Sequence, residues 1–270
     1  MSKLKVLKAL FSNPKEIITL GYQAMVRKKF TVDFEKMVWE HFKIRQLPTI
    51  DILDLEPGLK DNINIYTFLP NTSTIPDMLL LRLLAKKFKD CSYLEIGSFR
   101  GESLASVSEV VKECTSITLS KEEQRELGFT EEEIKVSGIF LSKVPNLTTI
   151  YHNSLTFDFD AHKNKYDLIF VDGDHEYSSV VKDTQNVFKL LKNEDSIIVW
   201  HDYGYDSAAV RYDVFAGILE GTPEAYRKNL YHVSNTMCAV FMRGKFPTYY
   251  TNLKQFPNKT FKIAVEAERM

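Results

Sequence analysis

Short apolar runs alternate with segments of helical spacing over residues 74–242. The apolar runs predict strands at residues 92–96, 116–119, 147–151, 166–171 and 196–200. The segments around them predict helices at residues 74–89, 102–113, 121–127, 131–141, 177–191 and 208–219. Residues 231–233 and 237–242 are expected to close the sheet as an antiparallel pair. This alternation indicates an α/β fold, with a doubly wound, mostly parallel sheet of seven strands and helices on both faces.

Residues 1–72 differ in character and are expected to form a mainly helical N-terminal cap. Up to Lys29 they carry seven basic residues and a single acid, Glu16, and apolar residues recur at helical spacing on both sides of Pro14. A basic amphipathic helix of this kind can contact an anionic membrane surface. We favour the alternative, helices packed on the main domain with their lysines in solvent.

Changes of pattern also set the remaining boundaries. Residues 32–42 predict a helix, and the loop-like stretch 47–71 holds one candidate strand at residues 64–69. We therefore expect three parts, which are the cap at 1–72, a main domain at 73–246 and an extension at 247–270.

Composition narrows the class of protein. The chain has 270 residues, of which 44% are hydrophobic, and its formal net charge is −1. It can therefore bury a sizeable core, and a broad basic surface for nucleic acid is disfavoured. Its three cysteines are widely spaced, which argues against a disulfide framework and a zinc cluster and for a reducing compartment. Because no membrane span or signal-peptide pattern is visible, we expect a cytoplasmic protein.

The most informative motif follows the strand at residues 92–96. Glu95, Gly97 and Gly101 have the spacing Glu-x-Gly-x-x-x-Gly, between a buried strand and the start of a helix. Such a turn presents free backbone N–H groups at the carboxyl edge of a sheet, where α/β folds bind nucleotide-like ligands. Glycine turns after strands also serve packing alone. The spacing differs from the Gly-x-Gly-x-x-Gly of dinucleotide-binding folds, which disfavours a nicotinamide oxidoreductase.

Two further strands end in polar residues that can bind a metal. Asp172 follows one apolar run, and His201 and Asp202 follow the next. Because parallel strands share a carboxyl edge, these side chains are expected to meet beside the glycine turn. Asp172, His201 and Asp202 would form a partial shell for a divalent cation, either Mg²⁺ or, because of the histidine, Mn²⁺ or Fe²⁺. The alternative is structural, with Asp174 capping the next helix and the His-Asp pair in a hydrogen-bonded loop.

Together these motifs resemble the class I S-adenosylmethionine (SAM) dependent methyltransferases of the macrocin O-methyltransferase-like group, methyltransferase family 24. The resemblance covers residues 74–242 and extends more distantly to the metal-dependent catechol type. It implies a Rossmann-like fold in which Asp172, His201 and Asp202 hold the metal. His175 stands where the catechol type has a lysine base, and its ordinary pKa suits proton transfer near neutral pH. The implied catalytic residues are His175 and His201, and the implied cofactor contacts of this first part are Glu95, Gly97, Ser98, Gly101, Ser103 and Asp172.

Further cofactor contacts are expected after the second and third strands. Methyltransferases usually end the second strand with an acid that binds the ribose, whereas this chain has Thr118-Leu119-Ser120, similar to cyclopropane fatty acid synthases. The resemblance assigns the ribose to Thr118 and Ser120, with Glu123 or Gln124 as further candidates. Asn153 and Ser154 stand where the family contacts adenine.

The predicted function is a SAM-dependent O-methyltransferase assisted by a divalent cation, Mg²⁺ or Mn²⁺. Its acceptor would be a vicinal diol or catechol-like group on a small molecule or saccharide. The acceptor lid is expected from the N-terminal segment and from residues 203–227. The open alternatives are a metal-independent enzyme with a histidine base, and a non-catalytic protein that keeps the SAM-binding fold. N-methylation is disfavoured because no Asn/Asp-Pro-Pro-aromatic sequence follows Val171. A homo-oligomer is left open.

Overall fold

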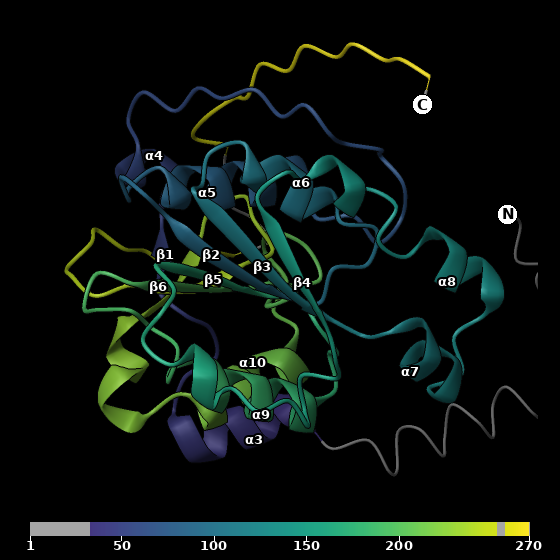
Figure 1. The fold of residues 1–270 in the computed structure, drawn as a ribbon. Coiled ribbons are helices and arrows are strands. Elements are labelled where there is room, and N and C mark those ends of the chain that lie inside the picture. The colour runs from purple at the N-terminus through teal and green to yellow at the C-terminus, as the bar shows by residue number, and fades with distance from the viewer. Residues whose placement is uncertain (1–32, 253–256, 270) are drawn as a thin grey trace, which may run out of the picture.

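A computed structural model describes residues 33–252 and 257–269 of the chain (Figure 1). Its centre is one sheet, which has eight strands among the described residues and the order β1-β7-β8-β6-β5-β2-β3-β4. The strands are β1 (Thr49–Ile50), β2 (Ser92–Ile96), β3 (Glu113–Thr118), β4 (Leu147–Tyr151), β5 (Leu168–Val171), β6 (Ile197–Trp200), β7 (Leu230–Val233) and β8 (Ala239–Phe241). Only β8 runs antiparallel to its neighbours, β6 and β7. The predicted α/β fold with a mostly parallel sheet and a closing antiparallel pair is therefore confirmed, with eight strands in place of seven.

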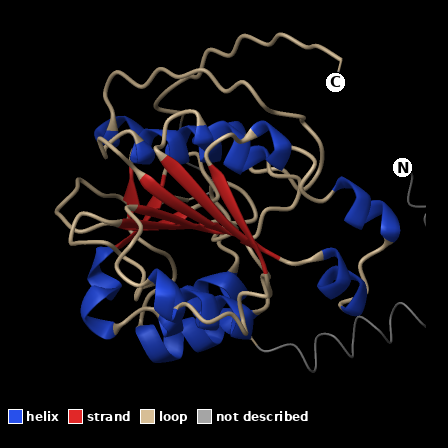
Figure 2. Cartoon of the chain, viewed as in Figure 1, coloured by secondary structure: helices blue, strands red, loops and turns tan. Residues whose placement is uncertain are grey.

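Helices cover both faces of the sheet, as the strand and helix alternation predicted (Figure 2). Figure 1 shows α4, α5 and α6 over one face and α3, α9 and α10 over the other, while α7 and α8 project to the side beyond β4. The helices are α3 (Phe34–Phe42), α4 (Ile52–Leu55), α5 (Ile75–Ala85), α6 (Glu102–Ser108), α7 (Lys121–Glu126), α8 (Glu131–Val136), α9 (Tyr177–Val187) and α10 (Tyr212–Gly221). Short 3₁₀ turns lie at Leu141–Lys143, Asp160–His162 and Glu224–Asn229.

Each face of the sheet has its own apolar core, because successive side chains of a strand point to opposite faces. On β2, Tyr93 belongs to the cluster under α5 and α6, and Leu94 belongs to the cluster under α9 and α10. Every residue of β2, β5 and β6 is buried. This explains why β5 and β6 appear in the sequence as continuous apolar runs, while β2 also holds the buried Ser92 and Glu95.

Local signals account for the helix ends. Helix α5 begins after Thr74 in a capping box that Asp77 completes, with Pro76 in the first turn. It ends at Ala85, earlier than the predicted Lys89. The predicted helix 131–141 divides into α8 and a 3₁₀ turn, because Gly138 adopts a left-handed conformation with φ of +71°. The predicted helix 102–113 ends at Ser108, since β3 begins already at Glu113.

The candidate strand at residues 64–69 is wrong. Phe68 and Asn71 have left-handed backbones, with φ of +54° and +60°, which a strand does not allow. The hydroxyl groups of Thr67 and Thr72 instead donate to the carboxylate of Glu102 on α6. The segment is thus held against the start of α6 as a loop.

The sheet also takes in residues from both predicted extensions. Thr49 and Ile50 form β1, which pairs in parallel with β7, and the backbone of Tyr249 bonds Thr49 from the outer side. The predicted helix at 32–42 is confirmed as α3. The helical spacing on both sides of Pro14 falls outside the described residues. The predicted boundaries at residues 72 and 246 stay predictions.

Candidate functional site

The strand register brings the three predicted motifs to one edge of the sheet. Ile96 at the end of β2 lies beside Val171 at the end of β5, and Val171 lies beside Trp200 at the end of β6. The residues that follow these strand ends, including Gly97 and Asp172, therefore start at the same level. From β2 the chain continues to β3 and β4 on one side, whereas β5 and β6 lie on the other side, so the strand order reverses at β2. Open α/β sheets usually bind their ligands at the carboxyl edge beside such a reversal.

Gly97 packs directly against the backbone after β5. Its φ is +84°, and a Cβ atom on it would lie 2.1 Å from the carbonyl oxygen of Asp172. Both the conformation and the space therefore require glycine. Gly101 is left-handed as well, with φ of +87°, and caps α6. The glycine turn thus has a structural role in joining two strand ends.

A cavity of about 770 Å³ opens along this edge. Its volume is within the range of small-molecule sites in proteins. Of the predicted cofactor contacts, the residues that line it are Gly97, Ser98, Thr118, Asn153, Ser154 and Asp172. Its wall also includes Gln124, a further ribose candidate, and residues 71–73 of the N-terminal region. Gly101 and Ser103 line a small recess of about 30 Å³ that shares the Gly97 and Asp172 wall.

Glu95 and Ser120 are placed differently, and neither lines these two pockets. Glu95 is fully buried, and its carboxylate accepts hydrogen bonds from the hydroxyl groups of Tyr93 at 2.7 Å and Ser103 at 2.9 Å. Burial raises its pKa to about 8, so the carboxyl group is largely neutral at pH 7. Glu95 therefore supports the glycine turn from below.

The Ser120 hydroxyl is used as a helix cap. It accepts from the backbone N–H of Glu123, whose own carboxylate accepts from the backbone N–H groups of Ser120 at 2.8 Å and Asn153 at 2.9 Å. Glu123 thereby joins the ends of β3 and β4, which carry the predicted ribose and adenine contacts. Of the two predicted ribose contacts at this strand end, Thr118 lines the cavity and Ser120 does not.

Asp183, which the sequence analysis missed, lies behind the predicted adenine contacts. It is a buried acid on α9 whose carboxylate is hydrogen-bonded by Ser154, and its Oδ1 has no hydrogen-bond partner among the described residues. Burial raises its pKa to about 6. The helical spacing of α9 places Asp183 on the buried face, and this is the one signal that could have found it.

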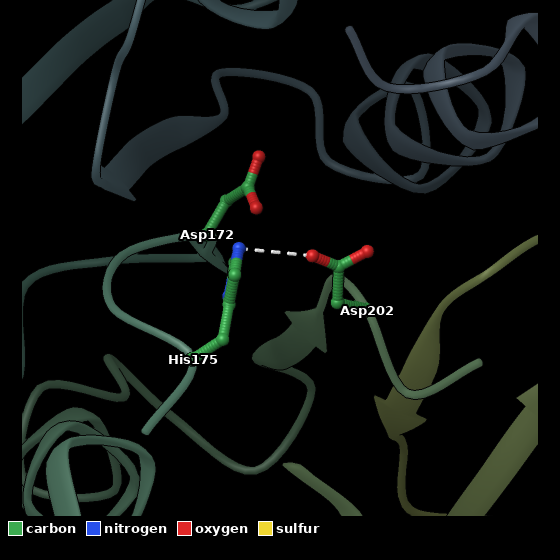
Figure 3. Close-up of side chains that lie close together, drawn as sticks. All are labelled: Asp172, His175 and Asp202. Carbon is green, nitrogen blue, oxygen red and sulfur yellow. Dashed lines mark ion pairs between the residues drawn. The ribbon is translucent and has the colours of Figure 1, made fainter. Parts of the chain in front are cut away.

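Asp172, His175 and Asp202 form the chemical centre of the site (Figure 3). One ligand atom from each of these residues lies within 4.8 Å of the other two. Nε2 of His175 lies 2.9 Å from a carboxylate oxygen of Asp202, and this contact is the main cause of the raised pKa of His175. Two carboxylates and an imidazole are a donor set that suits Mg²⁺ or Mn²⁺, so the residues present fit a divalent cation.

His201 reaches the same carboxylates from below. Its Nδ1 lies 3.2 Å from Asp172 and 3.4 Å from Asp202, and its Nε2 lies 3.4 Å from Asp77. Burial opposes the charged ring, but the negative charges of Asp172 and Asp77 outweigh it and hold the pKa of His201 well above its usual value. Because both nitrogens donate toward carboxylates, neither offers the lone pair that a metal ligand needs. The geometry therefore disfavours the predicted His201 as a metal ligand and leaves Asp172 and Asp202 as the carboxylates that would hold a cation.

Asp77 is a second residue that the sequence analysis missed. It is fully buried, and it accepts from the backbone N–H groups of Thr74 at 2.7 Å and Met237 at 2.8 Å as well as facing His201. These contacts join the start of α5 to the turn between β7 and β8 and to the end of β6. Its position three residues after the capping Thr74 was the available signal.

The guanidinium group of Arg211 lies beside the cluster of Asp172, His175 and Asp202. Arg211 lies 3.4 Å from Asp202 and 3.2 Å from Asp213 through different nitrogens of its guanidinium group. Asp174, considered as a helix cap, accepts from the hydroxyl of Ser179 at 2.6 Å on the first turns of α9. The predicted capping role of Asp174 is not found, because the N-cap of α9 is Glu176 and no side chain caps that helix start. Asp174 instead lines the cavity together with Asp172 and Asp202.

No helix in the described ranges, 33–252 and 257–269, has the length and apolar character that crossing a membrane requires.

Comparison with known proteins identifies the domain. Residues 94–203 match the family model of a methyltransferase domain, in agreement with the domain predicted from the sequence motifs. The narrower macrocin-like group stays a prediction. An uncharacterized protein of Acanthamoeba polyphaga mimivirus is 30% identical over 129 residues, which are 46% of this chain and 58% of that protein. The chain thus spans little more than half the length of this curated relative.

Solved methyltransferase structures are similar at a lower level. The O-methyltransferase TomG from Streptomyces achromogenes, involved in tomaymycin synthesis and solved with SAM, is 17% identical, with 65% of this chain and 84% of that chain covered and a TM-score of 0.44. The N-methyltransferase NodS from Bradyrhizobium japonicum WM9, solved with S-adenosyl-L-homocysteine, is 15% identical, with 69% and 93% covered and a TM-score of 0.42. At these TM-scores the likeness does not bear on the acceptor of this chain.

Proposed function

We propose that this chain, a SAM-dependent methyltransferase by its domain at residues 94–203, methylates a hydroxyl oxygen of a small molecule or saccharide with help from a divalent cation. The observation that carries the proposal is the meeting of Asp172, His175 and Asp202 beside the glycine turn, in one cavity. A methyl donor bound along the glycine turn and the ends of β3 and β4 would then face a cation and a base.

SAM, when bound, supplies an electrophilic methyl group, and most of the remaining catalysis is positioning. The polar groups that line the cavity beyond Gly97 are suited to a nucleoside. Thr118 offers a hydroxyl group, while the Ser98 hydroxyl is already hydrogen-bonded to Ser116 at 2.7 Å. Asn153 offers an amide whose Oδ1 accepts from the backbone N–H of Leu155. We assign the ribose and adenine to this end of the cavity.

Asp172 and Asp202 are the residues that would hold the cation. A bound Mg²⁺ or Mn²⁺ would lower the pKa of an acceptor hydroxyl and fix its position. Vicinal hydroxyl groups can approach such an ion together, which favours a diol or catechol-like acceptor. We assign His201 to hold the two carboxylates in place from below, through its contacts of 3.2 Å and 3.4 Å.

His175 is the residue that would accept the acceptor's proton. With Nε2 donating to Asp202 at 2.9 Å, the neutral ring keeps its lone pair on Nδ1. The carboxylate orients the ring and stabilises its charged form after proton transfer, as in other His-Asp pairs. His175 lines the cavity, so a hydroxyl can reach it.

The experiment compares His175→Gln and Asp172→Asn with the wild type in SAM-dependent methylation of a panel of diols and catechols. Loss of the base should lower kcat by about 10²–10⁴-fold, with SAM binding by calorimetry retained in both variants. His41→Gln, an exposed histidine on α3, is the matched control and should keep full activity. Full turnover in excess chelator would reject the cation.

A metal-independent enzyme is the second candidate, and the His175 to Asp202 contact of 2.9 Å favours it, because such a pair can act as a base alone. In that case chelator has no effect, and Asp202→Asn lowers activity as much as His175→Gln does. A chain that binds no SAM at all would support the non-catalytic alternative.

A cytoplasmic location is also proposed. Cys91, Cys114 and Cys238 are all free and buried, which suits a reducing compartment.

A further inference from the structure

Residues 260–268 have the pattern of a β-strand but lie outside the sheet. Phe261, Ile263 and Val265 alternate with polar or small residues, as in a strand with one apolar face. These three side chains are 39%, 61% and 64% exposed. Figure 1 shows the segment, in yellow, running extended along the outside of the molecule. Within the described ranges, no hydrogen bond or ion pair joins these residues to the rest of the chain.

The segment starts from a fixed point. Nζ of Lys259 lies 2.7 Å from the carboxylate of Asp51, and both side chains are nearly buried. Lys259 also donates to Asn235 at 3.2 Å, and Asn258 donates to Asp51 at 2.9 Å. The strand-like residues after Lys259 are therefore presented from a set position on the surface.

The segment is self-complementary. When two copies are placed antiparallel about Ala264, Lys262 of one lies opposite Glu266 of the other, and Ile263 lies opposite Val265. The two-fold symmetry repeats each of these pairs, so the interface has two opposite-charge pairs and two Ile–Val pairs, and Phe261 opposite Ala267 adds two more apolar pairs. Opposite charges and β-branched residues are both favourable as cross-strand neighbours. The apolar side chains of both strands lie on one face in this register.

We propose that residues 260–268 are a dimerisation strand, which pairs antiparallel with the same residues of a second copy of this chain. The pairing gives hydrogen-bond partners to backbone groups that otherwise bond only to solvent. It also brings together the side chains of Ile263 and Val265, which are more than half exposed in the single chain. An interface this small is expected to form a concentration-dependent dimer, not a permanent one. The proposal does not depend on the reaction catalysed.

Sedimentation of the full chain over a range of concentrations tests the dimer. The measured mass should rise from 31.2 kDa toward twice that value. Lys262→Glu places like charges opposite each other twice, and should raise the dissociation constant by about tenfold. Glu266→Lys should do the same, and the double variant Lys262→Glu/Glu266→Lys should restore the wild-type value. Glu268→Lys, which lies opposite Thr260 in this register, is the control and should change little.

Three outcomes overturn the proposal. The first is a mass of one chain at all concentrations. The second is a dimer that the single charge changes leave intact, because another surface then forms it. The third is a dimer that both single changes weaken but the double variant does not restore. In that case the segment contacts a different surface of its partner.

Discussion

Two buried acids near the cavity keep their protons at pH values where exposed acids have lost them. Glu95 and Asp183 lie behind the glycine turn and the predicted adenine contacts, and burial raises their pKa to about 8 and about 6. A neutral carboxyl group can both donate and accept, which suits the hydroxyl partners that surround Glu95. Both residues therefore affect the site indirectly, by supporting residues that line its pockets.

The Glu95 carboxyl gives the fold a pH dependence. Its pKa is about 8 in the folded chain against an ordinary value of 4.5. The folded state then binds a proton that the unfolded state loses, so this group's contribution to stability falls as pH rises from about 4.5 to about 8. Glu95→Gln replaces the carboxyl group with an amide of similar shape that does not titrate, so this pH dependence disappears in the variant.

We expect the Glu95→Gln variant and the wild type to unfold at similar temperatures at pH 5, and the variant to unfold at a higher temperature at pH 8.5. Thermal unfolding followed by circular dichroism measures both. Glu132→Gln, an exposed position on α8, should show no such divergence. Parallel curves for Glu95→Gln and wild type would mean that Glu95 is ionised in the folded chain.

Gly97 and Gly128 separate conformational strain from steric clash. Both have left-handed backbones, with φ of +84° and +86°, but only Gly97 has neighbours within 4 Å of an added Cβ. Gly128→Ala should cost about 1–2 kcal/mol of unfolding free energy. Gly97→Ala adds a clash with the Asp172 backbone and should cost more than about 3 kcal/mol.

Chemical denaturation of the two glycine variants measures these costs, and calorimetry with SAM measures binding. We expect SAM binding to be lost in Gly97→Ala and kept in Gly128→Ala. Equal costs at the two positions would contradict the close approach of the glycine turn to the end of β5.

At this scale, residues at strand ends were predictable and their buried partners were not. Gly97, Asp172 and Asp202 follow apolar runs directly, so the sequence pattern places them on one edge. Asp77 and Asp183 act from helices, and only the folded structure shows which strand end each of them meets. The sequence pattern placed His201 at the correct edge of the sheet and predicted it as a metal ligand. Its role depends on Asp77, however, which lies 124 positions away in the sequence.

Among the elements, helix α5 has the closest connection to the site. Asp77 in its first turn completes the capping box and accepts from Met237 in the turn between β7 and β8. The same carboxylate faces His201. One side chain thus stabilises a helix start, a hairpin turn and the charged ring below the acidic cluster.

Asp77→Asn should therefore be costly despite its similar shape. The amide removes the buried negative charge that pairs with His201, and breaking a buried pair typically costs about 3–5 kcal/mol. We expect a loss of about 3 kcal/mol in the free energy of unfolding and a lower kcat, since Asp172 and Asp202 lose their support. Asp54→Asn, an exposed acid in the first turn of α4, is the control for denaturation and turnover. A variant as stable as the wild type would show that the Asp77 contact to His201 carries little energy.

Element prediction succeeded where pattern and length agreed. β2 and β4 were predicted with their observed bounds, because each is a five-residue run with clear flanking signals. β1 was missed because two residues carry no periodicity, and their pairing with β7 is a long-range contact. Residues 64–69 are rich in apolar and aromatic residues, as a strand would be, but the hydroxyl contact of Thr67 to Glu102 and the left-handed Phe68 hold them as a loop.

For the whole molecule, the alternation of strands and helices was sufficient to predict the parallel sheet and the convergence of its strand ends. It was not sufficient to predict the extra edge strand, which depends on pairing between residues 49–50 and 232–233. The cavity is built from both halves of the sheet, since β3 and β4 carry one end and β5 and β6 carry the other. Ligands at its two ends should therefore stabilise the same cooperative unit.

This expectation can be tested by ligand-dependent unfolding. SAM at 100 times its dissociation constant should stabilise the folded chain by about 2.7 kcal/mol, which corresponds to about 5–10 °C in Tm for a domain of this size. Mn²⁺ should add a second shift that Asp172→Asn removes, because the carboxylate pair is then broken, while the SAM shift remains. Asp195→Asn, an exposed acid before β6, should keep both shifts. A Mn²⁺ shift that survives Asp172→Asn would place the ion away from the acidic cluster, and the histidine base would then act without it.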